Sequence, residues 1–256
     1  MILLRWRLGV LPGLLLVLAL GALAAEAGSF TVYPTQVHLS SRAPSSLVTL
    51  GNQGDEAARF QLSVVSWEQS ARGEPHFTPT RDLVFFPPLL SLAPKAERKI
   101  RVGKITPCGA SEKTYRLFIE ELPPLRSPGR PDTGTHVRTL TRFGIPVFLE
   151  PTKPAAKRNV ELTDIRPGHF SVAVRNPGNV HLHLHRVRIK GLGAAGVSVF
   201  ERELASSYVL AGGTRLYEVD VPPAECPRVE RLEVDVTTDG DTFAERFEAP
   251  AGVCGR

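Results

Sequence analysis

The fold is decided by the stretch Phe143-Gly144-Ile145-Pro146-Val147-Phe148-Leu149-Glu150-Pro151, which ends a string of short β-type segments that begins at Phe30. Pro and Gly turns separate these segments, and apolar residues alternate with polar ones inside them. Alternation with a period of two is typical of strands that bury one face. Stretches with apolar residues at helical spacing are scarce. The chain is therefore predicted to be all-β.

An apolar run precedes these segments at residues 8–25, and two arginines stand before it. A basic start, a short apolar core and small residues near its end are typical of a secretory signal peptide. We place the signal peptide at residues 1–27 and expect an exported protein without stable membrane insertion after cleavage. An uncleaved anchor is the alternative, although a Pro-Gly pair interrupts a run that is already short for a spanning helix.

Two pairs of segments recur in the same order along the chain. Residues 48–54 and 172–178 each end an alternating strand with Asn-x-Gly or Asn-Pro-Gly, and 92–95 and 210–213 each precede another strand. Asn and Gly accept the positive φ values that tight hairpin turns require, so we expect hairpins at the first pair. The repetition predicts two immunoglobulin-like β-sandwich domains in series, each of about 100 residues.

The boundary between the domains is expected where two prolines occur close together, at Pro151 and Pro154. Proline lacks a backbone donor and favours extended conformations before it, which indicates a short stiff linker. The domains are then residues 28–150 and 151–256. In the first strand the apolar face changes at Pro34, which predicts either a strand that passes from one sheet to the other or a simple edge strand.

Composition and motifs exclude several classes of function. The formal net charge is +5 at pH 7, but Lys and Arg are scattered and the chain is exported, so nucleic acid is not an expected partner. The sequence contains no Gly-x-Ser-x-Gly elbow, phosphate loop or zincin pattern, and we predict no enzymatic activity and no cofactor.

Three cysteines and a row of histidines are the remaining chemical features. Cys226 and Cys254 both lie in the second domain and are predicted to pair in an oxidising compartment, which leaves Cys108 free or paired with a second-domain cysteine instead. The histidines His181, His183 and His185 alternate along one predicted strand. In a regular strand, successive histidines of this row are about 6 to 7 Å apart and the outer two about 13 Å, so at most two of them could chelate one metal. We interpret the row as a solvated strand face and assign no metal.

Six segments of the chain, taken in order, resemble one protein family. They are residues 30–35 (FTVYPT), 66–69 (SWEQ), 86–94, 99–102, 115–124 and 146–151. The pattern is similar to that of the PapD-like periplasmic chaperones of the chaperone–usher pathway, which assemble pili or fimbriae, and looks closest to the archaic branch grouped with spore-coat-protein-U systems. The resemblance covers most of the mature chain and is best in the first domain.

The resemblance implies two sandwiches at an angle, with a cleft between them and the first domain lending a strand to an incomplete pilin subunit. The resemblance also implies that the chaperone delivers the subunit to an outer-membrane usher. The donor strand is expected at about residues 136–147. The side chains expected on one face of it are Val137, Thr139, Thr141, Phe143, Ile145 and Val147; an ordinary core strand, a shifted register and a role for Leu140 are alternatives.

Two basic cleft residues hold the subunit's terminal carboxylate in better-known branches of that family. The matching positions here are Gln36 and Pro146. Gln36 can still donate hydrogen bonds and stays an anchor candidate, whereas proline offers no side-chain donor. We expect a replacement arginine near the cleft, with Arg116 the first candidate and Arg101 and Arg142 in reserve. An arginine can bind a carboxylate through two parallel hydrogen bonds.

Two other readings of the sequence stay open. One is a structural or adhesive surface protein built from the same sandwiches, and the other is a periplasmic metal-binding module that uses the histidine row. An exposed strand edge also invites the free protein to cap itself by dimerising.

Overall fold

The computed structural model describes residues 29–124, 139–249 and 253 of the chain. The predicted signal peptide at 1–27 lies outside these ranges. Within them the chain forms strands and two single-turn 3-10 helices, η1 (Ala194–Gly196) and η2 (Cys226–Arg228). Among the described residues, no helix has both the length and the apolar character needed to span a bilayer. The prediction of an all-β fold is confirmed.

Two sheets form the first domain. The four-stranded sheet has the order β1 (Phe30–Tyr33), β3 (Ser45–Asn52), β8 (Glu97–Lys104) and β6 (Leu83–Phe86). The second sheet has the order β2 (Val37–Leu39), β10 (Arg142–Leu149), β9 (Lys113–Leu122), β4 (Ala58–Gln69) and β5 (Pro75–Pro79), and β7 (Leu89–Leu92) also pairs with β4. Their facing side chains form one core around Phe60, Leu50, Ile100 and Leu117.

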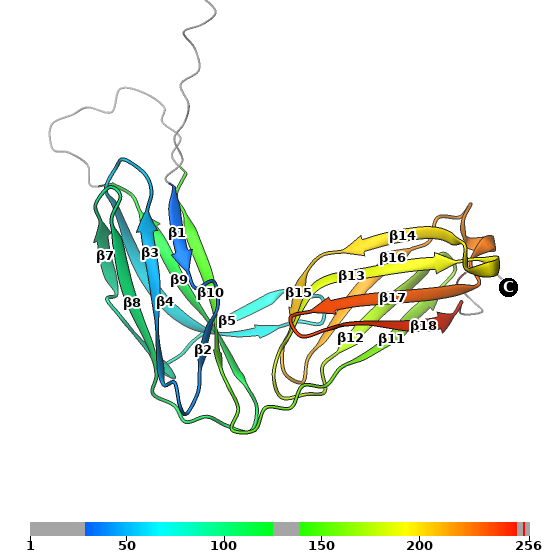
Figure 1. The fold of residues 1–256 in the computed structure, drawn as a ribbon, viewed down its shortest axis with the longest axis horizontal. Coiled ribbons are helices and arrows are strands. Elements are labelled where there is room, and N and C mark those ends of the chain that lie inside the picture. The colour runs from blue at the N-terminus through cyan, green and yellow to red at the C-terminus, as the bar shows by residue number, and fades with distance from the viewer. Residues whose placement is uncertain (1–28, 125–138, 250–252, 254–256) are drawn as a thin grey trace, which may run out of the picture.

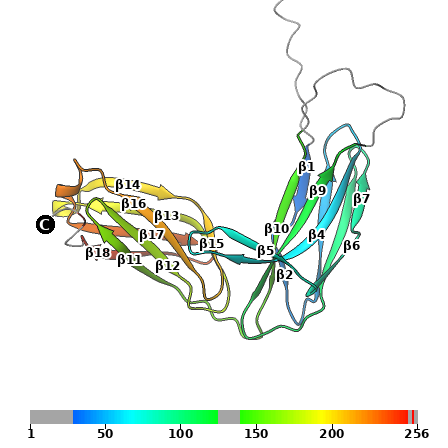
Figure 2. The same cartoon turned by 180° about the vertical axis from the view of Figure 1, so that it is seen from behind.

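The second domain is built in the same way from two further sheets. One is β11 (Asn159–Arg166), β12 (His169–Arg175) and β16 (Thr214–Asp220). The other is β14 (Ser198–Leu204), β13 (Leu182–Leu192), β17 (Arg231–Thr238) and β18 (Thr242–Glu248), with β15 (Ser207–Val209) also pairing with β13. Figure 1 shows the two sandwiches set at an angle, as predicted, and Figure 2 shows the same arrangement from behind.

The first strand passes from one sheet to the other at Pro34. β1 pairs antiparallel with β3, whereas β2 pairs parallel with β10 in the opposite sheet. The apolar side chains are therefore even-numbered before this proline and odd-numbered after it, because the two halves of the strand face the core from opposite sheets. Of the two readings of Pro34, the structure supports the strand that changes sheets.

The repeated Asn motifs are equivalent in structure, although their predicted role was wrong. β3 and β4 lie in different sheets, as do β12 and β13, so neither motif forms a hairpin. Neither asparagine adopts a positive φ. Instead Asn52 is buried and its side-chain amide donates to the Ala93 carbonyl at 3.2 Å, while buried Asn176 donates to the Leu210 carbonyl at 3.2 Å. Each amide thus joins the end of one strand to the other recurring segment of its domain, residues 92–95 in the first domain and 210–213 in the second.

The linker between β10 and β11 is tied to both domains. Thr152 N donates to the Gly109 carbonyl at 3.0 Å. The Asn179 side chain donates to the carbonyls of Ala110 at 2.7 Å and Lys153 at 2.9 Å. The boundary predicted between residues 150 and 151 falls in this segment, just after β10 ends at Leu149.

The β4–β5 hairpin makes a second contact between the domains. Leu216 N, on β16, donates to the Ala71 carbonyl at the hairpin tip at 2.7 Å, and Arg72 pairs with Glu218 at 3.3 Å. Both views show β5 reaching toward β15 of the second domain. The angle between the sandwiches is therefore fixed by a linker on one side and a hairpin on the other.

Cysteine states agree in part with the sequence-based prediction. Cys226 is disulfide-bonded and Cys108 is free. Cys254, the predicted partner of Cys226, lies outside the described residues, so this pairing stays a prediction.

Candidate functional site

Strand β10 is paired along both edges over only part of its length. It pairs with β9 from Arg142 to Leu149, but with β2 only from Val147 to Leu149. Glu121 N donates to the Thr141 carbonyl on the β9 side at 2.8 Å, and Glu150 N donates to Leu39 O on the β2 side at 2.9 Å. Hydrogen-bonding direction alternates along a strand, so the even-numbered backbone groups face away from β9.

No described strand pairs with that side of β10 at residues 142–146. Proline is tolerated at an edge because its missing N–H would have faced outward, and this accounts for Pro146 inside a strand. The first domain thus has an open strand edge, defined here as the outward backbone of Arg142, Gly144 and Pro146.

The predicted donor side chains fall into two groups. Phe143, Ile145 and Val147 share one face as predicted, and that face packs in the first domain's own core, with Ile145 4% and Val147 0% exposed. Thr139 is exposed and Thr141 half-buried, and both precede the strand, which begins at Arg142 in the described residues. Val137 lies outside the described residues.

Arg116 lies next to the open strand edge. It is the cross-strand neighbour of Pro146, and its guanidinium donates to the Gly144 carbonyl at 3.0 Å. The guanidinium carbon lies 3.9 Å from the centre of the Trp67 ring and 5.9 Å from that of Tyr208. Burial lowers the pKa of Arg116 from its usual value. None of the described carboxylates forms an ion pair with it.

The other anchor candidates are already engaged or lie elsewhere. Arg142 pairs with Glu120 at 2.6 Å and stacks on Phe118 at 3.9 Å. Arg101 is on β8 in the opposite sheet and donates to Ser45 at 3.2 Å. The Gln36 amide donates to the Tyr208 hydroxyl at 3.0 Å, so it bridges the domains. Arg116 is the one of the three arginines that combines nearness to the open strand edge with no described anionic partner.

Aromatic rings from both domains meet beside Arg116. We call this group the hinge cluster; it comprises His38, Trp67, Phe148, His181, His183 and Tyr208. Phe148 stacks on His181 with ring centres 3.7 Å apart, and His183 stacks on Tyr208 at 4.3 Å. Phe148 is 0% exposed yet belongs to neither sandwich core of the described residues, because it is buried between the domains.

A buried acid–imidazole pair crosses the same junction. The Glu112 carboxylate accepts hydrogen bonds from the backbone N–H of His181 at 3.0 Å and lies 2.9 Å from its Nδ1. The side chains are only 2% and 10% exposed. Sequence reasoning missed Glu112, because the partners are 69 residues apart and nothing in either local pattern connects them.

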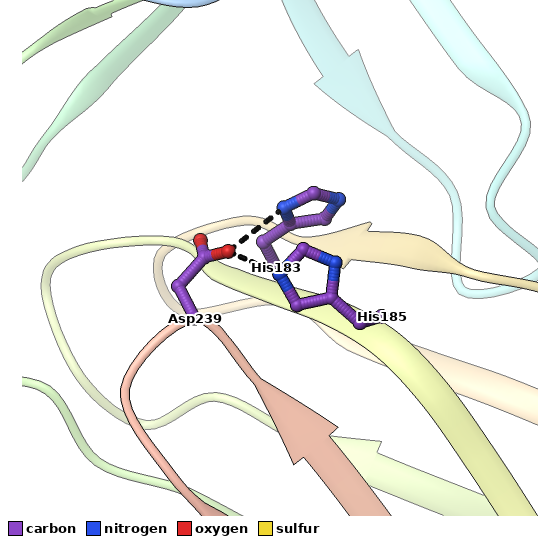
Figure 3. Close-up of side chains that lie close together, drawn as sticks. All are labelled: His183, His185 and Asp239. Atoms are coloured by element: carbon purple, nitrogen blue, oxygen red, sulfur yellow. Dashed lines mark hydrogen bonds and ion pairs between the residues drawn. The ribbon is translucent and has the colours of Figure 1, made fainter.

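The histidine row is not the solvated strand face that the sequence suggested. His181 pairs with Glu112, and His183 is 17% exposed, so only His185 is largely solvated. β13 carries an irregularity between Leu184 and Arg186, and the rings of His183 and His185 lie 4.3 Å apart. Asp239, in the turn between β17 and β18, reaches both imidazoles (Figure 3). The sequence predicted that at most two of these histidines could approach one metal ion, and in the structure two of them, His183 and His185, lie together.

A cavity of about 410 Å³ opens between the domains behind the hinge cluster. It lies between Trp67 on β4, Tyr115 on β9 and the turn at residues 210–213. The Tyr115 hydroxyl donates to Asp82 at 2.7 Å, and Lys113 donates to the same carboxylate at 3.0 Å. These bonds lower the pKa of Asp82, the one from Tyr115 most of all, and hold this wall of the cavity in place.

Comparison with known proteins identifies the first domain. Residues 29–155 match the family model described as the pili and flagellar-assembly chaperone, PapD N-terminal domain. No curated protein matches the chain.

Several solved structures share the whole architecture. The CsuC–CsuE chaperone–tip adhesion subunit pre-assembly complex from archaic Csu pili of Acinetobacter baumannii matches at 17% identity and a TM-score of 0.57, covering 85% of this chain and 97% of that one. The YadV chaperone matches at 14% identity and a TM-score of 0.60, covering 86% and 99%. The SafB chaperone–SafA pilin structure from Salmonella enterica matches at 16% identity and a TM-score of 0.56, covering 88% and 99%. At these identities the likeness establishes the fold.

Proposed function

The chain belongs to the PapD-like family of pilus-assembly chaperones, and from this we propose that it captures pilus subunits on the open strand edge of β10. The observation that carries the proposal is that no described strand pairs with one side of β10 at residues 142–146, beside a half-buried arginine that forms no ion pair with a described carboxylate. The proposed role is to hold a folding subunit, which requires no bond to be made or broken and therefore no enzyme.

The open strand edge suits an incomplete β-sandwich. A subunit that lacks one strand exposes an unpaired sheet edge and an apolar groove, and both favour aggregation. Added strands supply main-chain hydrogen bonds, and their side chains fill the groove; the chaperone–pilin pair is a known example of this mode. Here the backbone of Arg142 and Gly144 would supply the bonds. Leu140 is 41% exposed, so its side chain is available at the groove, whereas Phe143 packs against the first domain's own core.

Arg116 suits the terminal carboxylate of the subunit. A half-buried cation without an anion loses solvation and gains no charge partner, which is the meaning of its lowered pKa. An arriving carboxylate would restore that partner, and the flat guanidinium can bind it with two parallel hydrogen bonds. Stacking on Trp67 fixes the plane of the guanidinium in advance.

The proposal extends to compartment and partners. We infer a periplasmic location from the predicted signal peptide, delivery of subunits to an outer-membrane usher, and no contact with nucleic acid. Several similar structures are chaperone complexes with a pilin or tip adhesin, and one comes from an archaic system like the branch that the sequence motifs favour. Without a client, the open strand edge would favour self-capping through dimers.

The experiment that tests capture is native mass spectrometry of the Strep-tagged chain purified from the periplasm of cells that encode it. We expect a one-to-one complex with a small protein whose sequence is an incomplete β-sandwich. Isolation of polymers on the cell surface would instead support an adhesive or structural role. A chain that purifies alone under every growth condition that produces pili would contradict the proposal.

Charge reversal at Arg116 tests the anchor. Arg116→Glu is expected to abolish recovery of the subunit, because it places a carboxylate where the client's own carboxylate would bind. The matched control is Arg101→Glu, which makes the same change on β8 in the opposite sheet and is expected to leave recovery unchanged. Circular dichroism and melting curves of both variants must remain close to wild type. Normal capture by Arg116→Glu would refute the anchor assignment while leaving capture by the strand edge intact.

A further inference from the structure

His183, His185 and Asp239 form a compact group of ligand atoms at the end of the second domain that faces the first. His183 and His185 come from β13, and Asp239 comes from the β17–β18 turn. One imidazole nitrogen from each histidine and one Asp239 oxygen all lie within 4.8 Å of one another. Figure 3 shows both imidazoles directed at the same carboxylate oxygen.

The separation of His183 and Asp239 fits a tetrahedral metal ion, whereas His185 now hydrogen-bonds to Asp239 directly and would have to move outward to admit one. Zinc binds imidazole nitrogen at about 2.0 to 2.1 Å and carboxylate oxygen at about 2.0 to 2.2 Å, so two ligands on one ion are about 3.3 Å apart. The separation between His183 Nδ1 and Asp239 Oδ1 is 3.3 Å. The side chains of His185 and Asp239 are 47% and 55% exposed, so they are free to open slightly around an ion.

The surroundings of His183 leave Asp239 as the described partner of its buried nitrogen. His183 Nδ1 has no accessible surface and lies 3.3 Å from Asp239 Oδ1. A buried polar nitrogen needs a partner, and a metal ion between the ring and the carboxylate would satisfy it. The ring cannot turn away easily, because it stacks on Tyr208 with planes 7° apart.

The local fold holds the third ligand in position. In the β17–β18 turn, Thr238 N donates to the Asp241 carbonyl at 2.8 Å, and the Thr238 hydroxyl contacts Gly240 N and Asp241 N at 3.4 and 3.3 Å. These bonds shape the turn and leave the Asp239 side chain free to point at β13. Two imidazoles and one carboxylate are ligands suited to zinc and neighbouring divalent transition metals.

We propose that His183, His185 and Asp239 bind one divalent transition-metal ion of the zinc type, with a fourth coordination position open to water. This proposal is independent of subunit capture and goes beyond it. Because Tyr208 stacks on His183 and accepts a hydrogen bond from Gln36 of the first domain, the bound ion would also brace the hinge cluster.

The test is isothermal titration of the mature chain with ZnCl₂ after EDTA treatment and dialysis. The chain carries a Strep tag, because a His tag would itself bind the metal. It also carries the substitution Cys108→Ser, because the free thiol of Cys108 could bind zinc. We expect one zinc per chain and a rise in melting temperature with zinc, because a ligand that binds only the folded state stabilises it. His185→Ala and Asp239→Asn should each weaken binding at least tenfold and remove the rise.

The matched control is His169→Ala in the same domain. His169 also faces two carboxylates, those of Asp164 and Asp220, but among the described residues it does not belong to a group with a second histidine. Its replacement should leave zinc binding unchanged. Either absence of binding to the wild-type chain, or undiminished binding to folded His185→Ala and Asp239→Asn variants, would overturn the proposal. Co²⁺ titration, with the visible absorption of a tetrahedral ion, gives a second readout that does not depend on heat of binding.

Discussion

The two halves of β10 differ sharply although they belong to one continuous strand. Residues 147–149 have β9 on one side and β2 on the other, and their side chains are all buried. Residues 142–146 have only β9, and their outward edge is open. β2 is three residues long, so it covers one half of β10 and stops. The length of a neighbouring strand therefore decides where β10 is structural and where it is free to bind.

The difference extends to what each half touches. Residues 147–149, the closed half, place Phe148 in the hinge cluster, which joins the domains. Residues 142–146, the open half, face Arg116, and the Gly144 carbonyl already accepts a hydrogen bond from that side chain. Holding the domain angle and presenting a binding edge are thus separate tasks of adjacent residues, and mutations should be able to separate them.

Phe148→Ala is expected to have the largest effect, because it empties the buried contact between the domains. A buried Phe→Ala change costs about 3 to 5 kcal/mol of unfolding free energy. Urea unfolding followed by fluorescence should show this loss, and small-angle scattering should show a wider spread of domain angles. The control is Phe86→Ala, where the ring is 72% exposed and the cost should be below about 0.5 kcal/mol. Equal stability of the two variants would contradict the role of Phe148.

A pair of proline substitutions tests the edge itself. The Phe143 N–H faces β9, so Phe143→Pro should cost about 1 to 3 kcal/mol more than Phe143→Ala, because it leaves a buried carbonyl without its donor. The Arg142 N–H faces the open side, so Arg142→Pro should match Arg142→Ala in urea unfolding. Arg142→Pro should nevertheless reduce subunit recovery, since it removes a donor from the open strand edge. If both prolines destabilised the free chain equally, the assignment of the open edge would be wrong.

The smallest expected effect is that of Asp82→Asn, which removes the charge from a hydrogen bond beside residues 147–149, the closed half of β10. Val147 lies opposite Tyr115, whose hydroxyl donates to Asp82 and lowers the pKa of that carboxyl below its usual 3.8. A carboxyl with a lowered pKa in the folded state stabilises it above about pH 4, and this contribution is lost as pH falls through the folded pKa. Asp82→Asn should therefore lower the urea midpoint at pH 7. At pH 3 its difference from wild type should shrink, whereas a difference that stayed constant with pH would contradict the ionised bond.

Local patterns in the sequence were sufficient for the strands and for the family. Alternating residues predicted the all-β class, the change of face at Pro34 foreshadowed the change of sheet, and the recurring Asn motifs indicated two related domains. The role of those motifs was wrong, however. Whether Asn52 and Asn176 form hairpins or cap strand ends depends on which sheet the next strand joins, and that is a tertiary property.

The amino-acid sequence was enough to predict the all-β class and two sandwich domains, because strand alternation acts between near neighbours. It also indicated Arg116, Arg101, Arg142 and Gln36 as anchor candidates. Their surroundings became known only in three dimensions, where Glu120 pairs with Arg142, Gln36 bonds to Tyr208 and Arg101 lies in the opposite sheet. The Glu112–His181 pair and the His183–His185–Asp239 group were likewise decided in three dimensions. Glu112 lies 69 residues from His181 and Asp239 lies 54 residues from His185, and no local pattern records contacts over such separations.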